Sequence, residues 1–136
     1  MILVDTSAWI EFDRATGSPV DTRLTDLIGS GDEVAVTEPV IMEVLSGARD
    51  ESRERDLRRL LDRFTLLRFE APTHFAGATR IYRACRRAGV TPRGLIDCMI
   101  AAVAVAHEAA VLAHDRDFAA IARVIGLDLD GHSLHR

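Results

Sequence analysis

Four acidic residues, far apart in the chain, have the side chains best suited to chemistry. Asp5 follows the apolar run MILV, and Asp115 follows VLAH. Glu43 lies in the segment EPVIMEVLSGAR, and Asp97 lies in the apolar segment GLIDCMIAAVA. Carboxylate oxygens are the ligands that a hard divalent cation such as Mg²⁺ or Mn²⁺ prefers. Whether they can act together depends on the elements that position them.

The apolar pattern alternates between strand-like and helix-like segments. Short apolar runs typical of buried strands occur at 1–4, 33–37, 65–69 and 111–113, with a short edge strand expected at 127–131. Helical periodicity and end signals predict helices at 6–14, 20–29, 38–49, 51–63, 73–88, 95–110 and 115–126. Such alternation is typical of an α/β fold with a mainly parallel sheet. Because the sequence shows no linker or repeat, we expect one domain over 1–136.

This topology predicts where the acids lie. Ligands of parallel sheets bind beyond the carboxyl ends of the strands, and Asp5 and Asp115 each come just after a predicted strand. Asp97 lies in the first turn of a helix that returns to the next strand, so its helix begins at that same edge. Glu43 lies within about two turns of a helix start, at ~1.5 Å per residue. We therefore expect the four carboxylates to meet at one rim.

A gathering of carboxylates needs a positive charge. Like charges in a partly desolvated crevice raise one another's pKa, and the 17 basic residues include no Lys. A bound Mg²⁺ or Mn²⁺ would compensate the acids. Next to a phosphate, such ions activate water and stabilise the leaving oxygen.

Each acid also has a purely structural explanation. Asp5 and Asp115 stand where an N-cap is expected, and Glu43 could be an ordinary solvated helix residue. For Asp117, a stabilising interaction with the helix dipole is the preferred interpretation over a role as a metal ligand. Asp97 is the hardest to explain structurally, because its neighbours are apolar and a buried carboxylate needs a partner.

Four segments in this order resemble a known family: ILVDTSAWI, EPVIMEVLSGAR, GLIDCMIAAVA and VLAHDRDFAAIAR. They resemble the PIN domain, specifically the VapC-type toxins of bacterial toxin–antitoxin modules, over essentially the whole chain. The resemblance implies an α/β/α sandwich around a central, mainly parallel twisted sheet. It also implies a metal-dependent endoribonuclease, with the metal ligands Asp5, Glu43, Asp97 and Asp115. Asp117 matches a further acid often seen in the family. Thr6 matches the family's hydroxyl beside the first acid, and Ser7 is a second candidate for that hydroxyl.

The resemblance also implies a reaction and partners. RNA phosphodiester bonds would be hydrolysed with Mg²⁺ or Mn²⁺, which gives a 5′-phosphate and a 3′-hydroxyl. A small VapB-like antitoxin would block the site, and the toxin would form a homodimer or a heterotetramer or octamer with it. Two rival functions are a receiver-like Mg²⁺-binding module, which usually needs a Lys near its site, and a non-catalytic metal-binding module of the same fold.

Contacts with RNA would have to come from a few arginines. The net charge of −4 argues against binding nucleic acid through bulk charge alone. Arg93, in the loop before the Asp97 helix, is the better RNA-binding candidate. Arg87 belongs to an arginine stripe on the long helix for which a solvated face is the favoured interpretation. For Trp9 we favour core packing over base stacking. No apolar run approaches the ~20 residues that cross a bilayer, so a cytoplasmic protein is expected.

Overall fold

The sheet of the protein places its first strand at the centre. A computed structural model describes residues 1–135, and its four strands are all parallel, in the order β3-β2-β1-β4. The strands are β1 (Ile2–Val4), β2 (Val34–Val36), β3 (Thr65–Leu66) and β4 (Ala110–Leu112). Leu3 lies between Ala35 of β2 and Val111 of β4. The predicted parallel sheet is thus confirmed.

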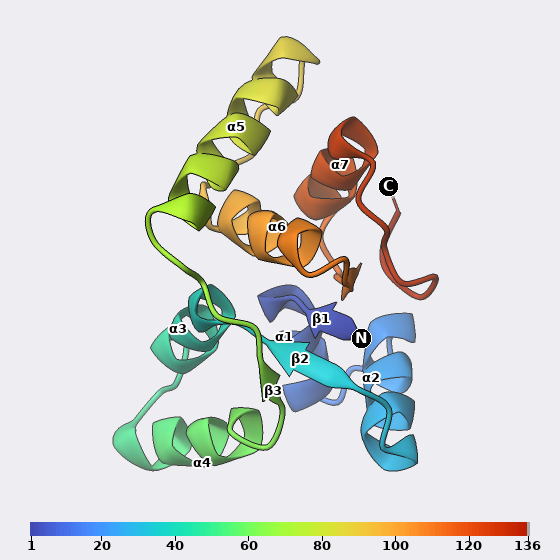
Figure 1. Ribbon diagram of the computed structural model, residues 1–136. Coiled ribbons are helices and arrows are strands. Elements are labelled where there is room, and N and C mark those ends of the chain that lie inside the picture. The colour runs from blue at the N-terminus through green and yellow to red at the C-terminus, as the bar shows by residue number, and fades with distance from the viewer. Residues whose placement is uncertain (136) are drawn as a thin grey trace.

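Helices cover both sides of this sheet. They are α1 (Thr6–Asp13), α2 (Pro19–Ser30), α3 (Glu38–Ser46), α4 (Glu51–Leu61), α5 (Thr73–Arg87), α6 (Ile96–Ala106) and α7 (Arg116–Ile125). Helices α5, α6 and α7 lie on one side of the strands, and α1 to α4 lie on the other (Figure 1). This is the α/β/α sandwich that the family resemblance implied.

Local signals explain where several helices begin and end. The Ser18 side chain accepts a hydrogen bond from the Asp21 backbone N–H at the start of α2, and Pro19 occupies the first turn. Gly31 and Gly126 end α2 and α7 in the left-handed conformation, which glycine adopts without a steric penalty.

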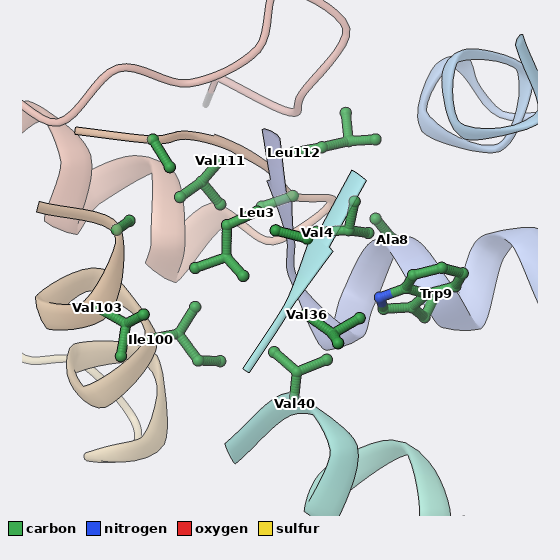
Figure 2. Packing of buried hydrophobic residues seen from close by; sticks show 14 of the residues in the cluster. Leu3, Val4, Ala8, Trp9, Val36, Val40, Ile100, Val103, Val111 and Leu112 are labelled. Carbon is green, nitrogen blue, oxygen red and sulfur yellow. The ribbon is translucent and has the colours of Figure 1, made fainter. Parts of the chain in front are cut away.

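Helix α6 is the centre of the core, as its apolar sequence predicted. Ile100 and Val103 are fully buried, and Figure 2 shows them on one side of the sheet with Leu3. Trp9 packs on the other side, in edge contact with Phe12 and against Phe64. Core packing of Trp9 is therefore confirmed, and base stacking by this buried ring is excluded.

The structure differs from the sequence prediction at the edges of the sheet. Strand β3 covers only Thr65–Leu66 rather than 65–69. The segment 127–131 makes a single bridge, from Leu129 to Val111, rather than a strand. Helix α6 ends at Ala106 because Glu108 takes a positive φ of 52°, which turns the chain into β4. Among the described residues, no helix is long and apolar enough to cross a membrane.

Candidate metal centre

The first and last strands each end in a carboxylate that begins a helix. Asp5 follows β1 and is the N-cap of α1, where its Oδ2 accepts a 3.0 Å hydrogen bond from the Ser7 backbone N–H. Asp115 is separated from the end of β4 by two residues and is the N-cap of α7, where it accepts a 2.8 Å hydrogen bond from the Asp117 backbone N–H. Capping and site formation are thus compatible, because each cap holds its carboxylate at the carboxyl edge of the sheet.

Three carboxylates lie close together at this edge. Asp97, Asp115 and Asp117 each have an oxygen within 4.8 Å of the other two. Glu43 lines the same pocket of about 370 Å³. Asp5 does not line the pocket, yet its charge is near enough to act on Asp97. The structure therefore brings together all of the acids selected from the sequence, and Asp117 belongs to the tight group although the sequence favoured a helix-dipole role for it.

Two hydroxyl groups hold the acids in place. Thr6 Oγ1 donates a 2.6 Å hydrogen bond to Oε1 of Glu43. Ser7 Oγ donates to Oδ2 of Asp5 and accepts a 2.8 Å bond from the His114 backbone N–H. These contacts tie the start of α1 to α3 and to the end of β4. Thr6 and Ser7 thus lie beside the acids, in the positions that the resemblance implied.

Burial and mutual repulsion disturb the protonation of two acids. Desolvation, followed by the charges of Asp5, Asp115, Glu43 and Asp117, raises the pKa of Asp97 to about 8. Burial also raises the pKa of Asp5 to about 6, although its hydrogen bonds from Ser7 act in the opposite direction. Burial is the main cause of both shifts, and the charges of neighbouring carboxylates raise both pKa values further.

One arginine compensates part of the cluster. Nε of Arg93 donates a 2.8 Å hydrogen bond to Oδ2 of Asp117, and its backbone N–H donates to the same oxygen at 3.1 Å. A terminal nitrogen of Arg93 lies 3.5 Å from Oδ1 of Asp115. The hydrogen bond from Arg93 lowers the pKa of Asp117. From the absence of Lys, we expected only a bound metal ion to compensate the acids. The ion pairs of Arg93 correct this expectation, because an arginine supplies part of the positive charge.

The two arginines proposed for RNA contact lie in different places. Arg93 lies on the wall of the acidic pocket. Arg87 instead lines a separate groove of about 460 Å³ between α5, α6 and α7, together with Arg80. The acidic pocket and the Arg87 side chain are therefore not brought together.

The donor set fits a hard divalent cation. Every acidic ligand candidate offers oxygen, as Mg²⁺ and Mn²⁺ prefer. Oδ1 of Asp5 is buried without a hydrogen-bond partner within the described chain, and a buried oxygen of this kind is costly unless something positive approaches it. The raised pKa of Asp97 points to the same missing positive charge.

Comparison with known proteins places the chain in a family. The sequence model of the PIN domain matches residues 2–124, and the chain therefore belongs to the PIN domain family. It is 44% identical over 128 residues to ribonuclease VapC11 of Mycobacterium tuberculosis and to VapC ribonuclease Mb1587 of Mycobacterium bovis. Each match covers 93% of this chain and 96% of the relative. The family resemblance in the four motifs is thus confirmed.

Solved structures share the fold at low sequence identity. VapBC2 from Rickettsia felis, bound to a promoter DNA fragment, superposes with a TM-score of 0.76 at 19% identity, covering 96% of this chain and 98% of that one. VapBC-1 from nontypeable Haemophilus influenzae gives 0.74 at 20% identity, covering 97% and 98%. These similarities support the α/β/α architecture.

Proposed function

We propose that this chain is a ribonuclease toxin that hydrolyses RNA phosphodiester bonds with Mg²⁺ or Mn²⁺. One observation carries the proposal: acids from four distant segments meet at one edge of the sheet, where the Oδ1 atom of Asp5 has no hydrogen-bond partner among residues 1–135. The names of the 44% identical relatives, which are ribonucleases, support the same activity. We assign the function to one domain over residues 1–136.

The acids have distinct tasks in this proposal. Asp5, Glu43, Asp97 and Asp115 would hold the ion, with Asp117 at the rim. A bound divalent ion would lower the pKa of water and stabilise negative charge on the leaving oxygen. Thr6 keeps Glu43 oriented, Ser7 does the same for Asp5, and Asp97 must release its proton before it can act as a ligand. Attack of water in line with the departing 3′-oxygen gives a 5′-phosphate and a 3′-hydroxyl.

A protein inhibitor is part of the proposal. Two of the solved structures that share this fold are VapBC2 and VapBC-1, and we propose a VapB-like antitoxin for this chain. Toxin and antitoxin would form heterotetramers or octamers, built on a toxin homodimer. The antitoxin tail would lie along the pocket that Trp9, Val44 and Leu57 line together with the charged Asp13 and Arg14, and an Arg on the tail would approach the acids. A structure of the complex with this groove empty would contradict that placement.

RNA cleavage by purified, antitoxin-free protein tests the activity. We expect cleavage with Mg²⁺ or Mn²⁺ and none with a chelator. Glu43→Gln and Asp97→Asn should each lower the rate by about a hundredfold or more, because the ion supplies several kcal/mol of stabilisation. Asp26→Asn, an exposed acid on α2, is the matched control and should cleave normally. Metal binding without any RNA cleavage would favour a non-catalytic metal-binding domain instead.

A further inference from the structure

Arg93 contacts two of the three acids that form the candidate metal group. Its guanidinium contacts Oδ2 of Asp117 and lies near Oδ1 of Asp115. These two residues supply two of the three carboxylates that lie within 4.8 Å of one another. The third, Asp97, has no ion pair among the described residues and keeps a strongly raised pKa.

We propose that Arg93 is a latch that competes with the divalent ion for Asp115 and Asp117. In the metal-free protein the single positive charge of the guanidinium offsets part of the charge of these two carboxylates, and the arriving ion displaces it. This inference rests on the proposed function. Its physical basis is that the ion and the guanidinium would draw on the same two carboxylates, and that two cations a few ångströms apart repel each other.

The loop is built so that the side chain can leave without unfolding. The backbone N–H of Arg93 bonds Asp117 independently of the side chain, so this contact keeps the loop at the pocket. The Arg93 side chain is 80% exposed, and ion pairs at such exposure are weak enough to exchange. The released guanidinium would remain tethered at the rim, where a phosphate group of RNA would lie.

An ordinary stabilising ion pair would behave differently. If Arg93 only ordered the loop, its removal would loosen Asp115 and Asp117, and metal affinity would fall. A competing latch has the opposite sign, because removing the competitor frees both carboxylates for the ion. The direction of the change in metal affinity therefore separates the two roles.

Titration of the purified protein with Mn²⁺ alone, by calorimetry at fixed pH, tests the latch. Arg93→Ala should bind Mn²⁺ about threefold to tenfold more tightly than the wild type, as expected for the loss of two exposed ion pairs. Arg93→Lys should lie between the two, since Lys keeps the charge but lacks the planar fork. Arg83→Ala removes an exposed arginine of α5 and the same formal charge, so it should match the wild type.

Each outcome bears on one proposal or the other. Unchanged or weaker binding by Arg93→Ala, while Asp97→Asn still weakens binding, overturns the latch and leaves the proposed function standing. Absence of Mn²⁺ binding in the wild type overturns the proposed function, and the latch with it. Thermal melting checks that each variant is folded. If Arg93→Ala does not fold, the test rests on Arg93→Lys. The latch is then rejected if Arg93→Lys binds Mn²⁺ no more tightly than the wild type does.

Discussion

Thr6 and Glu43 are joined by a 2.6 Å hydrogen bond although they are 37 positions apart in the sequence. Thr6 opens α1 directly after Asp5, and Glu43 lies on α3. The bond therefore links the helix that follows β1 to the helix that follows β2, at the edge where both strands end. It restricts a carboxylate that would otherwise sample several rotamers on a partly exposed helix face.

Replacing Thr6 should weaken metal binding without removing a ligand. A hydrogen bond to a charged group contributes about 1.5–3 kcal/mol, and we expect Thr6→Val to lower Mn²⁺ affinity by about tenfold through loss of the Glu43 orientation. Thr6→Ser retains the hydroxyl and should bind nearly as the wild type does. Calorimetry provides the measurement, and equal affinity of Thr6→Val and wild type would show that the bond does not position Glu43.

The stability of the metal-free protein should fall as the pH rises. The pKa of Asp97 is raised from 3.8 to about 8 in the folded protein, so the fold favours the protonated form of this carboxyl over the charged form. The stabilisation is fully present below about pH 4 and is lost as the pH rises through about 8. Asp97→Asn should reduce this dependence to the smaller contribution of Asp5, whose pKa is raised to about 6, and should raise the melting temperature at pH 8. The melting temperatures of the wild type and of Asp97→Asn are measured in chelator across this pH range. If the two melting temperatures change with pH by the same amount, the assignment is contradicted.

Arg93→Ala should change two kinetic quantities in opposite directions. The Mn²⁺ concentration for half-maximal activity should fall, because the competing guanidinium is gone. The KM for RNA should rise, because a phosphate contact is lost, and its dependence on salt should weaken by about one charge. Steady-state cleavage over a matrix of Mn²⁺ and salt concentrations measures both. A KM equal to that of the wild type would remove Arg93 from the RNA contacts.

Ile100 should be among the most sensitive core positions. It is fully buried on α6, against the side of the sheet that carries Leu3. We expect Ile100→Ala to lower the free energy of unfolding by about 2–5 kcal/mol and Ile100→Val by about 0.5–1.5 kcal/mol. Val105→Ala, on the same helix but 52% exposed, should change it by less than about 0.5 kcal/mol. Urea unfolding of the metal-free proteins is the measurement, and similar losses at Ile100 and Val105 would contradict this view of the core.

The sequence predicted best the features that depend on local patterns and on general topology. The strand before Asp5 and the apolar helix α6 followed from periodicity, and the meeting of the acids followed from the rule for parallel sheets. The prediction of β3 was too long because its backbone bonds to β2 end with the one from the Leu67 N–H to the Val36 carbonyl. The Phe69 N–H bonds the Glu38 side chain instead. At 127–131 the backbone of Val111 bonds Asp128 and Asp130, and only one bridge forms.

The contacts of Arg93 lay beyond sequence reasoning. They depend on how the loop before α6 folds against the first turn of α7, and no spacing between Arg93 and Asp117 signals this. The only available hint was that both segments end at the same edge of the sheet. The sequence could therefore place Arg93 at the rim, but only the three-dimensional structure identifies Asp115 and Asp117 as its partners.

The central position of β1 has a consequence for the timing of synthesis. A ribosome makes β1 first, yet one of its two neighbours is β4, whose Ala110 pairs with Ile2. Until that segment emerges, one edge of β1 stays open and Asp115 has not been made. A nascent chain thus carries an incomplete centre until Asp115 has been made, and the acids can assemble only after β4 and the residues that follow it have emerged from the ribosome.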